Sequence, residues 1–176
     1  EPYYGYTTTQ VPAANAFLTS LIDETRRHRL TLVHGDYSPK NILVHDDRLI
    51  LLDHEVIHWG DPAFDLGFSL THLLSKAHHI PAQRTEFAAA ARLYWRTYTG
   101  VLGNVPWADP LETRAVRNTL GCLLARVAGR SPLEYMDEEE RTRQRQVVSD
   151  LMADPPTTID ELSARFIEGM NRYATC

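Results

Sequence analysis

Two polar loops contain side chains whose types and spacing suit phosphoryl transfer. The first loop carries Asp36 and, five residues later, Asn41, and the second loop opens with Asp53 directly after an apolar run. Phosphoryl transfer needs a carboxylate that orients the attacking hydroxyl and accepts its proton, and it needs oxygen ligands that hold Mg²⁺ against the phosphates. A hairpin between Asn41 and Asp53 would bring these two oxygen ligands together, with Asp36 beside the metal ion.

The segments that flank these loops predict a small β-structure. Apolar runs at 42–44 and 49–52, on either side of a polar tetrapeptide, are typical of a β-hairpin, and residues 31–33 predict a short strand before the first loop. Residues 1–12 show no periodicity and predict an extended lead-in, whereas residues 13–29 have an apolar face typical of a helix.

The chain from residue 63 onward has helical patterns. The first pattern predicts a buried helix that stops near His79, and residues 82–99 predict an Ala-rich helix. Signals for further helix starts follow at Asp109-Pro110, Ser131-Pro132 and Thr158. The sequence therefore predicts a mainly α chain with one β feature that carries the two polar loops.

The composition excludes several classes of protein. The chain has 176 residues, a net charge of −5 and 43% hydrophobic residues, which indicates one globular domain and argues against a nucleic-acid binder. No apolar stretch approaches the roughly 20 residues of a membrane span. The chain has only two cysteines, Cys122 and Cys176, which make no disulfide framework, so we expect a reducing, cytoplasmic compartment. The chain begins with Glu1 rather than Met, so we expect that a segment upstream has been cut off or left out.

Three segments resemble a known family of kinases in their order and spacing. They are His34-Gly35-Asp36-Tyr37-Ser38-Pro39-Lys40-Asn41, then Asp53-His54-Glu55, then Gly60-Asp61-Pro62-Ala63-Phe64-Asp65-Leu66. Together they resemble the signature of the aminoglycoside phosphotransferase and choline kinase family, most clearly over residues 31–75. The resemblance implies an α+β, mainly α fold: the C-terminal large lobe of the protein-kinase-like fold, with a small β-hairpin that carries the catalytic loops.

The resemblance also implies roles for individual residues. Asp36 would be the catalytic base, and Asn41 and Asp53 would be Mg²⁺ ligands. Glu55 matches a second acid that would assist the metal ion or its waters. The implied reaction transfers the γ-phosphate of ATP to a hydroxyl of a small molecule that is aminoglycoside-, choline- or sugar-like.

Two further residues are expected to support the site. By resemblance, His34 would brace the catalytic loop against the strand that ends at Asp53, and Asp65 would accept backbone N–H bonds from that loop. Such an acceptor is physically reasonable, because a helix start near a strained loop leaves donors to satisfy.

The nucleotide-clamping lobe of such kinases has no counterpart in the sequence. Only 33 residues precede His34, and the two lysines, Lys40 and Lys76, lie in the catalytic loop and near a helix end. We therefore expect a C-terminal lobe that is inactive alone and whose uncovered apolar face allows self-association. Its parts would be residues 1–30 (lead-in and first helix), 31–62 (loops on the hairpin) and 63–176 (helical subdomain).

Three other interpretations fit parts of the sequence. His54-Glu55-Val56-Ile57-His58 matches the zinc-hydrolase motif HExxH, but that motif requires a long helix, and this run follows a strand and precedes a helix stop. A non-catalytic binding module is the second alternative, although Asp36, Asn41 and Asp53 are all intact. The acidic run at residues 137–140 would suit a cationic substrate, but the arginines that follow it favour a solvated helix.

Overall fold

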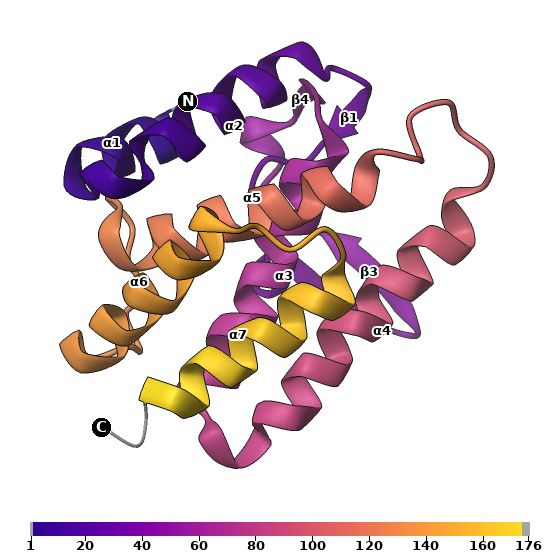
Figure 1. Ribbon diagram of the computed structural model, residues 1–176. Helices are drawn as coiled ribbons and strands as arrows, with labels where there is room; N and C mark the ends of the chain where they lie inside the picture. Colours follow the sequence, from indigo (N-terminus) through magenta and orange to yellow (C-terminus); the bar gives the residue numbers. More distant parts are fainter. Residues whose placement is uncertain (1, 174–176) are drawn as a thin grey trace.

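The computed structural model describes residues 2–173, so Glu1 and Cys176 lie outside the described part of the chain. It is mainly helical, with two small antiparallel sheets (Figure 1). The helices are α1 (Pro2–Gln10), α2 (Asn15–Arg27), α3 (Pro62–His79), α4 (Arg84–Leu102), α5 (Leu111–Ala128), α6 (Glu138–Ala153) and α7 (Ile159–Tyr173), and the strands are β1 (Thr31–Val33), β2 (Ile42–His45), β3 (Arg48–Leu51) and β4 (His58–Gly60).

The core lies around α3 and α5, which pack against each other at the centre of the molecule (Figure 1). Leu66, Leu70 and Leu74 follow one face of α3 at four-residue spacing and are almost completely buried. Helices α4, α6 and α7 extend this core, and α1 covers part of α5. Among residues 2–173, no helix combines the length and apolar character needed to cross a bilayer.

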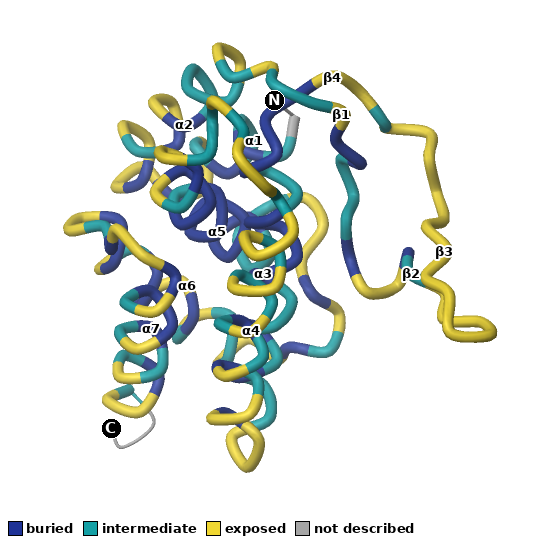
Figure 2. The backbone as a smooth tube through the Cα atoms, turned by 90° about the vertical axis from the view of Figure 1, so that its right-hand side faces the viewer, coloured by how far each residue is buried: buried dark blue, intermediate teal, exposed yellow. Residues whose placement is uncertain are grey.

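The predicted hairpin is confirmed as β2 and β3. Their register pairs Ile42 with Leu51 and His45 with Arg48, and the two turn residues, Asp46 and Asp47, have φ of 48° and 58°. Positive φ at both positions is the conformation of the type I′ turn, whose twist matches that of the flanking strands. Figure 2 shows this hairpin as an exposed arm at the edge of the helical core.

Two expectations for local structure were wrong. The expected lead-in at residues 1–12 is largely helix α1, because Tyr4 is buried against α5 and its Oη donates to Asn118 Oδ1 at 3.0 Å. Tertiary packing thus stabilises a helix that has no periodic pattern. The expected loop at residues 53–62 contains β4, which pairs with β1 in the register Thr31 to Gly60. This second small sheet connects the start of α3 with the strand that precedes the loop at residues 34–41.

Candidate active site

The loop between β1 and β2, residues 34–41, is held at its start by a carboxylate from α3. The backbone N–H of His34 donates to Asp65 Oδ2 at 2.6 Å, and that of Gly35 donates to Asp65 Oδ1 at 2.9 Å. Burial raises the pKa of the Asp65 carboxyl above its usual value, and the two donors oppose that rise. These are the contacts that the resemblance implied for Asp65.

The His34 side chain connects the two polar loops. Its Nε2 lies 2.8 Å from the Leu52 carbonyl oxygen, and its Nδ1 lies 3.3 Å from the backbone N of Asp36. Since a carbonyl oxygen only accepts and a backbone N–H only donates, these contacts assign the hydrogen to Nε2. His34 therefore bridges the loop at residues 34–41 and the residue that follows β3.

Asp36 and Asn41 lie in direct contact. Asn41 Nδ2 donates to the backbone oxygen of Asp36 at 2.9 Å and to Asp36 Oδ2 at 3.0 Å, and Lys40 Nζ lies 3.1 Å from the same Oδ2. Both partners of Nδ2 are acceptors, which assigns the nitrogen of the amide to this side and directs Asn41 Oδ1 away from it. The amide oxygen thus stays available as a ligand.

The hairpin returns the chain beside Asn41, because the backbone N–H of Leu52 donates to the Asn41 carbonyl oxygen at 2.9 Å. Asp53 follows with φ of 61° and precedes the short helical turn His54–Val56, which contains Glu55. Asp53 and Glu55 are exposed, and within residues 2–173 neither carboxylate makes a hydrogen bond or ion pair.

The donor set suits magnesium in its chemistry. Amide and carboxylate oxygens are the ligands that Mg²⁺ prefers, and the ion normally keeps several waters and takes one or two carboxylates together with substrate phosphates. No three His, Cys, Asp or Glu side chains gather as a metal site anywhere in residues 2–173. A cluster of that kind is typical of zinc rather than of nucleotide-bound Mg²⁺. Asn41 and Asp53 would therefore supply only part of the coordination shell of a magnesium ion.

The HExxH motif lacks the geometry of a zinc hydrolase. His54 lies in the short turn His54–Val56, whereas His58 begins β4 and its Nδ1 lies 2.9 Å from the Val56 carbonyl oxygen. In the zinc enzymes both histidines lie on one face of a single helix. The two imidazoles here belong to different elements, which agrees with the reading from sequence that the helical context is missing.

Two residues that position the site were missed in the sequence. Gly35 has φ of 83°, and a Cβ there would lie 2.9 Å from the Val56 carbonyl oxygen, so glycine allows the two loops to approach. A glycine between polar loop residues is a signal for such a turn. Ser69 Oγ donates to the Tyr37 carbonyl oxygen at 2.6 Å across 32 positions, a contact that carries no local signal.

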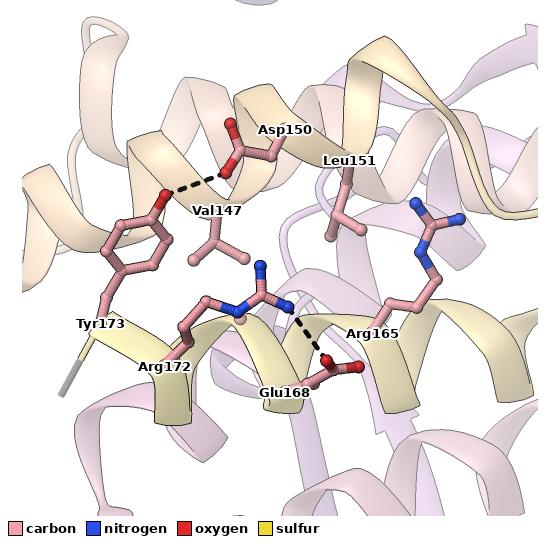
Figure 3. Close-up of a pocket in the computed structure, with 8 residues that line it drawn as sticks. Val147, Asp150, Leu151, Arg165, Glu168, Arg172 and Tyr173 are labelled. Atoms are coloured by element: carbon pink, nitrogen blue, oxygen red, sulfur yellow. Dashed lines mark hydrogen bonds and ion pairs between the residues drawn. The ribbon is translucent and has the colours of Figure 1, made fainter. Parts of the chain in front are cut away.

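A groove between α6 and α7 is a weaker candidate site (Figure 3). Its volume is about 120 Å³, and none of the predicted site residues lines it. Its polar groups pair with one another: Tyr173 Oη donates to Asp150 at 3.1 Å, and Arg172 pairs with Glu168 at 2.9 Å. The groove therefore presents satisfied groups rather than groups aimed at a ligand.

Comparisons with known proteins bear on the same segment as the two loops. A model of the phosphotransferase enzyme family matches residues 5–92, half of the chain. The matched segment contains every residue that the sequence analysis assigned to the site. No curated protein sequence matches the chain.

Proposed function

The chain belongs to the phosphotransferase enzyme family, and from this membership we propose that it holds the catalytic base and metal ligands of an ATP-dependent kinase for small-molecule hydroxyls. The observation that carries the proposal is the pair formed by Asp36 and Asn41, with Nδ2 of Asn41 donating to Asp36 Oδ2 at 3.0 Å. Asn41 thereby holds the Asp36 carboxylate through Nδ2, and its amide oxygen remains available to bind a metal ion.

In the proposed reaction Asp36 orients the acceptor hydroxyl and takes its proton. The hydroxyl oxygen bonds to the γ-phosphorus of ATP, the bond from that phosphorus to the bridging oxygen breaks, and ADP leaves. The positive charge of Lys40, 3.1 Å from Asp36 Oδ2, offsets part of the negative charge of the base and of the incoming phosphate. Asp65 and His34 act on the backbone of the loop and so keep Asp36 in position.

The proposed metal ligands are Asn41 Oδ1 and the Asp53 carboxylate, with Glu55 acting on the waters of the ion. When bound, Mg²⁺ would neutralise the negative charge that develops on the phosphates. The exposure of Asp53 and Glu55 supports this assignment, because neither carboxylate has a partner among residues 2–173 and both are free to bind a cation.

We further propose that a second, nucleotide-clamping lobe covers the exposed apolar residues of the two small sheets. We call this surface the hairpin face; it consists of Leu32, Leu43, Val44, Leu49, Ile50, Leu51, Leu52, Val56 and Trp59. Successive strand residues point to opposite sides of a sheet, so these side chains lie on both sides of the two small sheets. The set includes Leu52, which directly precedes Asp53 in the chain, and exposed apolar surface usually marks an interaction site. Without that lobe, the chain should transfer phosphate far more slowly than the roughly 1–100 s⁻¹ of typical kinases.

The metal assignment can be tested with Mn²⁺–ADP, whose paramagnetic ion broadens nearby amide signals in NMR even when binding is weak. We expect broadening confined to residues around Asn41 and Asp53. The substitution Asp53→Asn should abolish it, because asparagine tolerates the left-handed backbone but lacks the charge. Asp47→Asn is the matched control, since Asp47 is also exposed with positive φ but lies at the hairpin turn.

Three outcomes would contradict the proposal. Broadening that survives Asp53→Asn, or that disappears equally in Asp47→Asn, would remove Asp53 as a ligand. An absence of broadening at millimolar Mn²⁺–ADP would exclude a metal–nucleotide site in this chain and favour a non-catalytic binding module. Rapid phosphorylation of a small alcohol by the chain alone would overturn the need for a second lobe.

A further inference from the structure

A cluster of aromatic and basic side chains lies along α3 and α5. Phe68 and His72 share one face of α3 at four-residue spacing, with ring centres 5.3 Å apart. The Arg126 guanidinium from α5 lies 5.0 Å from the Phe68 ring centre and 5.9 Å from that of Tyr3. One helical turn beyond His72, Lys76 Nζ lies 3.6 Å from the ring centre of Tyr135. We call this set the Arg126 cluster: Tyr3, Phe68, His72, Lys76, Arg126 and Tyr135.

The Arg126 cluster is adjacent to the catalytic loop. Ser69, the neighbour of Phe68 on α3, donates to the backbone of the loop at Tyr37. Burial raises the pKa of Tyr3, and the Asp36 charge adds to that rise. Burial lowers the pKa of His72 to about 4, and the Asp36 charge opposes that fall. Tyr3 and His72 are therefore within electrostatic reach of the base.

The cluster contains polar atoms that lack protein partners. Within the cluster, four buried side-chain atoms make no hydrogen bond, namely Tyr3 Oη, His72 Nε2, Arg126 Nε and Tyr135 Oη. Buried polar groups are almost always satisfied, by protein, water or ligand. Four such atoms within one cluster need polar partners, which water or a polar ligand supplies.

The two cations of the cluster also lack acidic partners. Arg126 Nη1 donates to the Ser131 carbonyl oxygen at 2.9 Å, and Lys76 lies on the face of an aromatic ring. Neither side chain forms an ion pair with any carboxylate of residues 2–173. His72 is coupled electrostatically to Lys40, Lys76 and Arg126 as well as to Asp36, so three basic side chains lie within electrostatic reach of this histidine.

The acidic run at residues 137–140 does not balance these charges. Asp137 and Glu140 form a capping box at the start of α6, and Glu140 also pairs with His79 at 2.8 Å. Glu139 pairs with Arg143 within the helix. These contacts support the interpretation of this run as a solvated helix. The carboxylates of Asp137, Glu139 and Glu140 pair with groups of the protein rather than facing a cationic ligand.

Building on the proposed kinase function, we propose that the acceptor is an anionic alcohol, a hydroxy acid or a hydroxyalkyl phosphate. Its anion would bind Arg126 and Lys76, its carbon chain would lie against Tyr3 and Phe68, and its hydroxyl would reach Asp36. Guanidinium and ammonium groups recognise carboxylate and phosphate strongly through charge-assisted hydrogen bonds. A polycationic aminoglycoside would instead meet like charges from all three basic side chains.

The test is an NMR titration of the chain with four small alcohols of different charge. The probes are glycerate, glycerol 3-phosphate, neutral glycerol and cationic choline. We expect the two anions to bind at least tenfold more tightly than glycerol or choline, and comparison of glycerate with glycerol 3-phosphate distinguishes carboxylate from phosphate. The substitution Arg126→Gln should weaken anion binding at least tenfold. Arg130→Gln is the matched control, because Arg130 also stacks on a tyrosine, Tyr6, at 5.0 Å but lies outside the cluster.

The proposal is overturned if choline binds more tightly than both anions, if neither anion binds, or if Arg126→Gln and Arg130→Gln have equal effects. Should Arg126→Gln fail to fold, Lys76→Gln and the preference of the unsubstituted chain decide the question. The probes need neither metal nor nucleotide. A failed anion titration with intact Mn²⁺–ADP broadening would therefore remove the acceptor class alone and leave the kinase proposal standing.

Discussion

At the residue scale, the position of Asp36 depends on hydrogen bonds made by the side chains of Asp65, Ser69 and Asn41. Asp65 binds two backbone N–H groups before Asp36, Ser69 binds the carbonyl group after it, and Asn41 binds its carboxylate. The loop that carries Asp36 is thus held by two side chains from α3 and by Asn41 from the loop itself. A loop constrained in this way retains its geometry without a bound substrate.

Substitution Asp65→Asn should destabilise the chain more than Ser69→Ala. The amide offers one acceptor oxygen where the carboxylate offers two, so one buried N–H of the loop loses its partner. We expect a loss of about 2 kcal/mol for Asp65→Asn and about 1 kcal/mol for Ser69→Ala. Urea unfolding measures both, with the exposed Asp150→Asn as control. Equal effects of the three substitutions would contradict the anchoring role of Asp65.

The stability of the chain should fall as the pH drops through the titration of His72. Burial lowers its pKa from 6.5 to about 4, so between these values the unfolded chain binds a proton that the folded chain rejects. Stability is therefore complete above pH 6.5 and decreases toward pH 4, by about 2 kcal/mol between pH 7 and pH 5. Between pH 7 and pH 5, the His72→Gln variant should lose about 2 kcal/mol less stability than the unsubstituted chain. An identical pH dependence of the two proteins would contradict the assignment of this effect to His72.

At the scale of elements, sequence patterns predicted the structures that are stabilised by contacts between near neighbours in the chain. The hairpin was predictable because apolar runs flank a turn of two aspartates that tolerate positive φ. Helix α1 was not, because its stability comes from burial of Tyr4 against α5, more than a hundred positions away. The helix start expected at Ser131-Pro132 was also wrong: α6 begins at Glu138, where Asp137 and Glu140 form the capping box.

The close packing of α3 against α5 predicts opposite effects for two glycine substitutions. A Cβ on Gly67 would lie 2.7 Å from the backbone N of Thr119, so Gly67→Ala must push the two helices apart. We expect a loss of about 2–3 kcal/mol from this overpacking. Gly100→Ala, near the end of α4 with no atom within 4 Å, should stabilise the chain by about 0.5–1 kcal/mol. Thermal unfolding of both variants measures the difference, and a neutral Gly67→Ala would show that the helices have room to move.

At the scale of the whole molecule, the candidate site divides into a predictable and an unpredictable part. Asp36, Asn41, Asp53 and Asp65 lie within thirty positions, so one hairpin and one helix start bring them together. The Arg126 cluster joins residues from position 3 to position 135. No local periodicity encodes such a contact, which arises only when α1, α3 and α5 pack.

The hairpin face predicts that the chain self-associates through its two small sheets. Val44 and Leu49 are paired across the hairpin and are 69% and 71% exposed, so they present an open apolar strand pair to a second copy. Sedimentation velocity should show association that increases with protein concentration. The double substitution Val44→Lys and Leu49→Lys should abolish it, because lysine on an exposed strand opposes pairing with another copy.

The matched control is the double substitution Leu93→Lys and Val101→Lys, which adds the same charge on α4, where both side chains are also exposed. If this control dissociates the chain equally, net charge rather than the hairpin face governs association; a chain that stays monomeric at every concentration would contradict the prediction outright.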